Sequence, residues 1–199
     1  MNVRGTLVPC AGVVLLTAVL AGCGASGSAT AAGPKPPPPA PAESNPPGDI
    51  PDNQAYVPFA PPGTGFTVSV PEGWARTTAG PVTTFTDKLN RIEVSEHPAA
   101  KPPTPASVTA GDVPSLAKTV PAFAPGKATE VSRKAGTAVL YTYQGNSAAD
   151  PVTGKAVRDA FERYVFHHQG RDVVVTLSGP VNADNVDPWR TVTDSLRWR

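Results

Sequence analysis

The C-terminal two thirds of the chain shows the alternation of apolar and polar residues that predicts β-strands. Residues 66–70 alternate Phe, Val and Val with Thr and Ser, which is the period of a strand with one buried face. Residues 83–86 and 92–94 predict two further strands, and residues 87–90 predict a hairpin connection between them. Because short turns separate these three strands, we expect them to be antiparallel neighbours.

The strongest strand pattern lies between residues 157 and 177. Tyr164 and Phe166 occupy one face of the first run, and residues 169–171 then turn the chain into a second run. Two β-rich runs separated by a turn that contains glycine predict a hairpin. The three successive valines at 173–175 predict a central strand that is covered on both faces.

A first helix is expected after a proline-broken loop. Asp112 can cap it, and Pro114 suits its first turn. Leu116 and Val120 are spaced i,i+4 on one face, and Pro121 ends the run.

A second helix is expected near the C-terminus. Asp187 is interpreted as its N-cap and Pro188 as its first helical residue. Trp189, Val192 and Leu196 mark one apolar face. Trp198 follows in a short closing segment, which we expect to dock on the sheet.

The order of these elements predicts an α+β fold. Residues 129–132 and 138–143 add two strands, with a turn at Gly136 between them. The sum is an antiparallel sheet of about six or seven strands with helices packed on it, rather than an alternating βαβ arrangement.

The N-terminal segment has the pattern of a lipoprotein signal peptide. An apolar run from Leu7 to Leu20 follows Arg4 and is too short to span a membrane comfortably. It ends in Leu20-Ala21-Gly22-Cys23, which resembles a bacterial lipobox. We therefore expect a signal peptide over residues 1–22, lipidation of Cys23, and an anchor in the cell membrane on the extracytoplasmic side. The alternative is an apolar segment that stays attached as a transmembrane anchor.

Residues 23–62 have the composition of a tether. They are rich in Gly, Ala, Ser and Pro, with four consecutive prolines at 36–39. Such a segment has little to bury, so we expect it to be disordered and partly polyproline II, with a full stretch on the order of 100 Å. The globular domain is expected to cover residues 63–199.

Composition excludes several classes of site. The only cysteines are Cys10, inside the signal peptide, and Cys23. The domain therefore has no disulfide, zinc-thiolate site or cysteine nucleophile. The net charge is +1, and Arg4 leaves with the signal peptide, so the mature side chains sum to about zero. No clustered positive field is visible, so nucleic-acid binding is not expected.

The globular part resembles a known family. The run Gly65-Phe66-Thr67-Val68-Ser69-Val70-Pro71-Glu72-Gly73-Trp74, the long hairpin and the Asp187-Pro188-Trp189 helix that continues into Ser195-Leu196-Arg197-Trp198 look like the Mog1/PsbP-like fold, an α/β/α sandwich. With the lipobox and the tether, the whole chain resembles the LpqN-type lipoproteins of actinobacteria. The resemblance implies a domain without a cofactor that is not an enzyme. It implies binding of an envelope protein partner, or assistance to an envelope assembly or transport complex.

Two other functions remain open at this stage. A lipid or glycolipid carrier would need the sheet and a helix to part around an apolar cavity. A serine hydrolase would depend on Ser115-Leu116-Ala117-Lys118, an S-x-x-K pattern in which lysine can activate serine. The S-D-N and K-T-G elements that accompany it in penicillin-binding enzymes are missing.

Several residues of types that bind metal ions have a simpler structural interpretation. His167 and His168 are neighbours on a strand, so they point to opposite faces and cannot share one ion; we expect them to be exposed at the hairpin end. His97 precedes Pro98 in an expected loop. A group of oxygen-bearing residues suggests calcium but lacks the EF-hand spacing, so we interpret it as a turn into a capped helix. These residues are Asn182, Asp184, Asn185 and Asp187.

We predict that Cys23→Ala abolishes incorporation of labelled palmitate, because the thiol is the acceptor of the diacylglyceryl group in a lipobox. Cys10→Ala, inside the expected signal peptide, is the control and should leave labelling unchanged. Unchanged labelling of the Cys23→Ala protein would rule out the lipobox assignment.

Overall fold

The computed structural model describes residues 46–149 and 153–199. The expected signal peptide, Cys23 and the tether up to residue 45 lie outside this part, so their assignments stay predictions. Within residues 46–149 and 153–199, neither helix has the length and hydrophobicity of a membrane-spanning segment.

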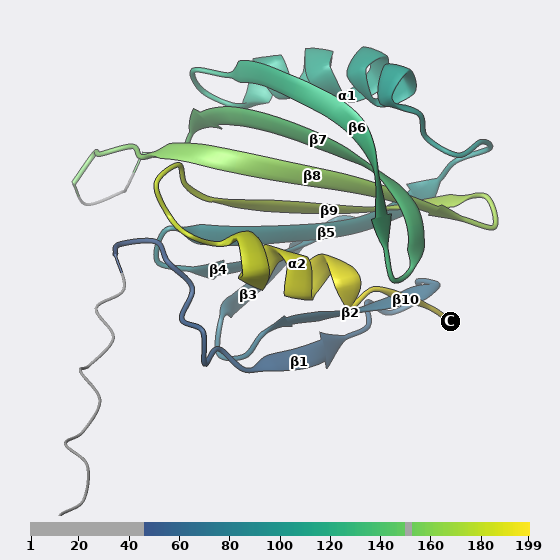
Figure 1. Cartoon of the computed structure of the whole chain (residues 1–199), viewed down its shortest axis with the longest axis horizontal. Coiled ribbons are helices and arrows are strands. Elements are labelled where there is room, and N and C mark those ends of the chain that lie inside the picture. Colours follow the sequence, from purple (N-terminus) through teal and green to yellow (C-terminus); the bar gives the residue numbers. More distant parts are fainter. Residues whose placement is uncertain (1–45, 150–152) are drawn as a thin grey trace, which may run out of the picture. The chain divides into compact units, whose positions relative to one another are not determined.

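A seven-stranded sheet forms the centre of the domain (Figure 1), and every neighbouring pair in it is antiparallel. Two helices pack on this sheet, so the predicted α+β class is confirmed. In spatial order the strands are β3 (Ala75–Ala79), β4 (Val82–Asp87), β5 (Asn90–Pro98), β9 (Arg171–Pro180), β8 (Arg158–His168), β7 (Gly136–Asn146) and β6 (Ala124–Arg133).

A second sheet of three strands has the order β1 (Tyr56–Phe59), β2 (Phe66–Pro71) and β10 (Arg197–Trp198). The strand predicted at 66–70 is therefore correct, but its expected pairing with the next strands is wrong. After β2, Gly73 adopts a φ of 83°, and the chain passes into β3 of the large sheet. The whole of β3 is exposed, so it carries no buried face that a pattern could reveal.

Strand β9 separates two hydrophobic cores. Val173, Val175 and Leu177 join the larger core with β2 and α2 (Val186–Asp194), whereas Val174 joins a smaller core with α1 (Pro105–Thr119). In Figure 1, α1 lies along one face of the large sheet, and α2 with the three-stranded sheet lies on the other. The prediction of a central strand covered on both faces is confirmed.

The hairpin between β8 and β9 turns at two residues. Gln169 has a φ of 47° and Gly170 a φ of 76°, which are the left-handed values of a type I′ turn. This turn aligns Phe166 with Val173 and His167 with Asp172. The predicted hairpin is confirmed, and its turn fixes which side chains of the two strands are neighbours.

Helix α1 begins seven residues before the expected cap at Asp112. Its N-cap is Thr104, and Pro105 occupies the first helical position. Pro114, expected in the first turn, lies inside the helix. Val108 is the one fully buried residue of the helix, so its first half lacks the apolar stripe that identifies a helix in a sequence. The expected end before Pro121 is confirmed.

Helix α2 begins at Val186, with Asn185 at the N-cap, rather than at Pro188. Its expected apolar face is confirmed, because Trp189, Val192 and the following Leu196 are buried. Trp198 lies in β10, pairs with Phe66 and donates its indole N–H to the carbonyl oxygen of Ala135 at 3.0 Å.

Residues 46–62, expected to belong to the tether, are part of the folded domain. Two asparagine side chains, Asn90 Nδ2 and Asn185 Nδ2, donate to the carbonyl oxygen of Gly48 at 2.8 and 2.9 Å. The backbone N–H of Ile50 donates to Asn185 Oδ1 at 2.8 Å, and the Ile50 side chain enters the larger core. Farther on, β1 pairs with β2. This segment shows no recognisable strand or helix pattern in the sequence, because prolines interrupt it.

One buried carboxyl group lies at the start of β8. Asp159 is 4% exposed, and its Oδ1 has no hydrogen-bond partner among the described residues. Burial penalises the charged form and raises the pKa of Asp159 to about 6. The folded state therefore holds this proton at a pH where the unfolded chain has lost it.

We predict that Ile50→Ala lowers the free energy of unfolding by about 2–5 kcal/mol, because it leaves a cavity in the larger core. Val57→Ala in β1 is the control: its side chain is 37% exposed, so the loss should be well below that of Ile50→Ala. Urea unfolding followed by tryptophan fluorescence measures both. Equal, small losses would show that residues before β1 do not belong to the folded unit.

We predict that Asp159→Asn removes a pH-dependent loss of stability. Below about pH 4, Asp159 is protonated in both the folded and the unfolded chain, so its burial does not lower the free energy of unfolding through ionisation. As the pH rises toward 6, the unfolded chain binds fewer protons than the folded one, so the wild-type stability falls and then stays constant above pH 6. A shift of two units corresponds to about 3 kcal/mol.

The measurement for Asp159→Asn is urea unfolding at pH values from 4 to 8. The difference between variant and wild type should grow between pH 4 and 6 in favour of the variant. Asp52→Asn, at an exposed position, is the control for the general loss of a carboxylate. A constant difference across the pH range would contradict the burial argument.

Candidate functional site

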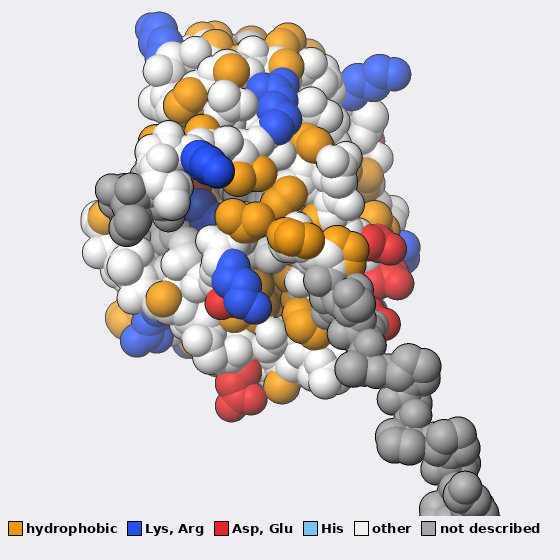
Figure 2. Space-filling model, turned by 90° about the vertical axis from the view of Figure 1, so that its left-hand side faces the viewer, with side chains coloured by type: hydrophobic (Ala, Val, Ile, Leu, Met, Phe, Trp, Pro, Cys, Tyr) orange, Lys and Arg blue, Asp and Glu red, His pale blue; other side chains and the backbone are white. Residues whose placement is uncertain are grey.

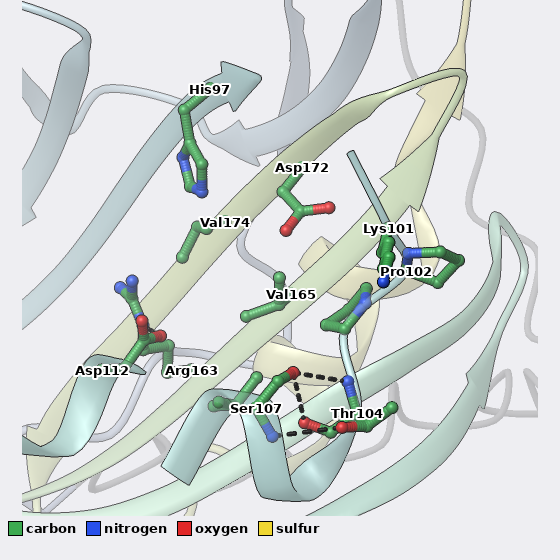
Figure 3. A pocket seen from close by; sticks show the side chains of 12 residues that line it. His97, Lys101, Pro102, Thr104, Ser107, Asp112, Arg163, Val165, Asp172 and Val174 are labelled. Atoms are coloured by element: carbon green, nitrogen blue, oxygen red, sulfur yellow. Dashed lines mark hydrogen bonds and ion pairs between the residues drawn. The ribbon is translucent and has the colours of Figure 1, made fainter. Parts of the chain in front are cut away.

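A cleft of about 360 Å³ opens between the first half of α1 and the large sheet (Figure 3). The sheet supplies its floor, the first turns of α1 form one wall, and the loop before the helix forms the rim. The lining residues are His97, Lys101, Pro102, Pro103, Thr104, Ser107, Val108, Asp112, Arg163, Val165, Asp172 and Val174.

The rim of the cleft is held rigid by its sequence. Pro102, Pro103 and Pro105 fix their backbone φ angles, so this loop has few conformations to lose on binding. The backbone N–H of Ala99 donates to the carbonyl oxygen of Gly170 at 2.9 Å, which ties the loop to the β8–β9 turn. The rim is therefore formed before any ligand arrives.

A reciprocal cap fixes the start of α1 beside the cleft. The backbone N–H of Ser107 donates to Thr104 Oγ1 at 3.1 Å, and the backbone N–H of Thr104 donates to Ser107 Oγ at 2.8 Å. The Ser107 hydroxyl also donates to the carbonyl oxygen of Thr104 at 3.0 Å. Both hydroxyl oxygens are thus engaged in holding the helix terminus.

An ion pair closes one end of the cleft. Arg163 Nε on β8 lies 2.7 Å from Asp112 Oδ2 on α1, and Arg163 Nη1 donates to Thr176 Oγ1 at 3.1 Å. These contacts join α1 to two adjacent strands. Asp112, expected as a helix cap, instead holds the middle of the helix to the sheet.

At the other end of the cleft, the lining residues His97 and Asp172 lie in a row with His167, which is outside the lining. The strand register places His97 of β5 and His167 of β8 directly opposite Asp172 of β9. His167 Nδ1 lies 2.6 Å from Asp172 Oδ1. Figure 3 shows His97 and Asp172 facing the same space, with Val174 below them. This end of the cleft therefore presents a carboxylate that is already hydrogen-bonded on one side.

The centre of the floor is apolar. Val108, Val165 and Val174 are all buried and pack in the smaller core. At the rim, the Lys101 side chain is exposed and makes no hydrogen bond or ion pair with the described residues. An apolar floor with a few fixed polar groups around it is the usual composition of a ligand site.

Ser115 and Lys118 do not take part in this site. Both are exposed on α1, and neither lines the cleft. The backbone carbonyl oxygen of Ser115 accepts a hydrogen bond from Thr119 Oγ1 at 3.0 Å, within the helix. The S-x-x-K pattern is thus separated from the cavity in which chemistry on a bound substrate would occur.

The histidines differ from expectation in their surroundings. His167 and His168 do point to opposite faces, as predicted, but both are half-buried rather than exposed. His167 contacts Asp172, and the ring of His168 stacks on Trp198 with centroids 4.9 Å apart. His97 lies in strand β5 rather than in a loop, because the strand continues to Pro98.

The four residues weighed as calcium ligands do not converge. Asn185 is buried and turns inward to hold Gly48 and Ile50. Asp184 and Asp187 are exposed, and the backbone N–H of Asp184 donates to Asp49 Oδ1 at 2.9 Å. Throughout the described ranges, no group of three or more His, Cys, Asp or Glu side chains is placed to hold a metal ion.

Most residues that build the cleft carry no signal of it in the sequence. Asp172 carried a usable signal, since a two-residue turn at Gln169-Gly170 requires it to face His167. The contact between Arg163 and Asp112 had no such signal. These residues are 51 positions apart, and their meeting depends on how α1 lies on the sheet.

Comparison with known proteins identifies the fold but no family. No protein-family model matches the sequence, and no curated protein matches it. Among solved structures, cyanobacterial PsbP from Synechocystis has a TM-score of 0.51 at 13% identity, covering 73% of this chain and 94% of that one. This likeness shows that the described domain has the PsbP fold, and it confirms the fold expected from the sequence.

Other solved structures are less similar. Mog1p, a Ran-binding protein of Saccharomyces cerevisiae, has a TM-score of 0.45 at 14% identity, covering 65% of this chain and 79% of its own. LpqN of Mycobacterium tuberculosis, described as involved in cell envelope biogenesis, has a TM-score of 0.41 at 16% identity, covering 73% and 91%.

A protein of Bacteroides thetaiotaomicron has a TM-score of 0.48 at 12% identity and is matched over 71% of this chain. The chain spans about half of that protein's length, 48%. Scores under 0.5 carry no argument about function, so membership of the LpqN family stays a proposal.

Proposed function

We propose that this chain is a lipid-anchored protein of the cell envelope whose folded domain is a non-catalytic binding module for a protein partner. The observation that supports the proposal is the preformed cleft between α1 and the sheet. Its rim is rigid, its floor is apolar, and Asp112, Arg163 and Asp172 are held by hydrogen bonds or ion pairs. Anchoring at Cys23 follows from the lipobox, and the envelope location from the resemblance to LpqN-type lipoproteins.

The dimensions of the cleft suit a short segment of a partner. A volume of about 360 Å³ lies at the lower end of the range found for ligand sites. The valines of the floor would receive a small apolar side chain. Asp172 would accept a hydrogen bond from the N–H groups of the segment, and Lys101 would donate to its oxygen atoms. Such a set of contacts is typical of peptide recognition.

Catalysis is the weaker interpretation of the same cleft. A nucleophilic serine or threonine would have to lie within hydrogen-bond reach of a general base. The hydroxyl oxygens of Thr104 and Ser107 instead accept hydrogen bonds from each other's backbone N–H at the helix cap. Ser115 and Lys118 lie on the exposed part of the helix.

A lipid carrier is also less well supported than a peptide-binding module. Acyl chains would have to lie against Asp112, Arg163 and Asp172, and desolvating such charged groups is costly. The interior on this side of the sheet is occupied by packed aromatic rings, including Tyr143 and Phe161, whose centroids lie 4.6 Å apart. Native mass spectrometry of the protein, purified without detergent, would detect a retained lipid as added mass.

We predict that a photoreactive amino acid at position 101 of the full-length protein forms an adduct with one discrete protein in the host cells, because Lys101 lies on the rim of the cleft. The same group at position 118, exposed elsewhere on α1, is the matched control and should give no such adduct. Electrophoresis and peptide mapping identify the adduct. Identical adducts from both positions, or an adduct with lipid alone, would contradict the proposal.

A further inference from the structure

Exposed aliphatic side chains gather where the described chain begins. Four large hydrophobic residues of the described part are exposed, and three of them are sequence neighbours of residues that lie against Gly48: Leu89, Val181 and Val186. Each directly adjoins a residue that touches Gly48. We call these three residues the root patch, because the tether joins the domain there.

The contacts around Gly48 bring the chain segments that carry the three patch residues together. Leu89 precedes Asn90 and Val186 follows Asn185, and both asparagines donate to the carbonyl oxygen of Gly48. Val181 follows Pro180, and a Cβ added at Gly48 would lie 2.5 Å from Pro180 Cγ. Figure 2 views this end of the domain. Hydrophobic side chains gather in the middle of this face, beside the start of the described chain.

Packing of the core does not explain the exposure of these aliphatic side chains. Val186 is 70% exposed, the largest exposed fraction among these aliphatic residues, although it is the first residue of a helix whose other apolar residues are buried. Single exposed hydrophobic residues are common, but a cluster of them beside polar residues is typical of an interaction surface. The fourth such residue, Val57, lies separately in β1.

In the sequence, three carboxylates adjoin the patch or the residues at Gly48. Asp49, Asp184 and Asp187 lie beside Gly48, Asn185 and Val186, and none of the three forms an ion pair with another described residue. The nearby cations are already used: Lys88 lies 4.0 Å from Asp87, and Arg190 lies 3.5 Å from Asp194.

Arg158 adjoins Val181 through a backbone hydrogen bond, but its guanidinium donates to the carbonyl oxygen of Ala122 at 2.6 Å. Arg158 keeps its positive charge in this contact. The charged residues named around the patch are nonetheless five carboxylates and three cations, and among the described residues Asp49, Asp184 and Asp187 form no ion pair.

We propose that the root patch is a second docking surface, which binds a segment of a protein partner that carries aliphatic side chains flanked by Lys or Arg. The aliphatic groups would cover Leu89, Val181 and Val186, and the cations would pair with the free carboxylates. The chemistry favours a basic protein segment over a bilayer, because the same carboxylates repel anionic headgroups. The surface is separate from the cleft and does not depend on the function assigned to it.

The position of the patch supports the same occupant. Only 23 positions separate Cys23 from Pro46, so a lipid anchor at Cys23 would hold this end of the domain within about 80 Å of the bilayer. A partner embedded in that membrane would meet the root patch readily. This step depends on the proposed anchor, whereas the chemistry of the patch does not, and the experiment below tests the chemistry alone.

The test uses the mature full-length chain carrying Cys23→Ala, which needs no detergent, and two synthetic 15-residue amphipathic peptides. One contains only Lys and Leu, and the other has Glu in place of each Lys. Titration calorimetry should show saturable binding of the Lys–Leu peptide and none of the Glu–Leu peptide. Val186→Ser should weaken binding about tenfold, which corresponds to loss of one buried aliphatic contact.

The controls separate the patch from general charge attraction. Val57→Ser removes an exposed valine elsewhere and should change the affinity less than twofold. Asp184→Asn should weaken binding and reduce its dependence on salt. Val186 and Asp184 are exposed, so their variants should keep the wild-type circular dichroism spectrum.

Two results would overturn the proposal. One is an equal effect of Val57→Ser and Val186→Ser, or equal binding of the two peptides. The other is that the Lys–Leu peptide does not bind, whereas the protein binds vesicles of phosphatidylcholine with phosphatidylglycerol and Val186→Ser abolishes this vesicle binding. That result would assign the patch to the bilayer. Neither result would bear on the crosslink expected from position 101, which tests the cleft.

Discussion

The fold depends on the burial of strand β9 on both of its faces. Its odd-numbered apolar residues, 173, 175 and 177, pack under β2 and α2, and Val174 packs under α1. A strand covered twice must have a helix or a sheet on each side, so both layers are required by this one run of valines. The neighbouring strands β5 and β8 then place their own side chains by register with β9. The two neighbouring strands and the two covering layers are thus placed around this central strand.

The two layers cover the sheet differently, and this difference produces the cleft. The larger core is closed by a sheet of three strands and by α2, whereas the smaller core is covered by α1 alone. The helix is held near its start by Val108 and at its middle by the ion pair between Asp112 and Arg163. The proline-rich loop then sets the opposite rim. A cleft results where the helix leaves part of β8 and β9 uncovered.

The two proposed binding surfaces have different physical origins. The cleft is a concave site with an apolar floor, formed by packing between secondary-structure elements. The root patch is an exposed surface formed because Asn90 and Asn185 draw the chain at Gly48 onto the domain. Buried asparagines that satisfy a backbone carbonyl are costly to replace, so this end of the tether is fixed to the domain. If both proposals hold, a single domain would contact one partner through its cleft and a basic segment through its root patch.

The sequence by itself determined the elements whose signals are local. The period of two at 66–70, the valines at 173–175 and the glycine turn at 170 predicted strands and a hairpin that the structure contains. Alternation and turn chemistry act within a few residues, so they can be recognised without knowing the partners. The same holds for the apolar face of α2.

Only the tertiary structure decided which distant residues meet. The pairing of β2 with β1 and β10, the early start of α1, the contact of Arg163 with Asp112 and the inclusion of residues 46–62 all depend on long-range packing. In the sequence, Gly48 lies in a proline-rich segment that predicts a tether. In the structure, Asn90 and Asn185, which are 42 and 137 positions away, donate hydrogen bonds to its carbonyl oxygen. Neither those partners nor the burial of Ile50 leaves a local pattern, because burial is a property of the assembled layers.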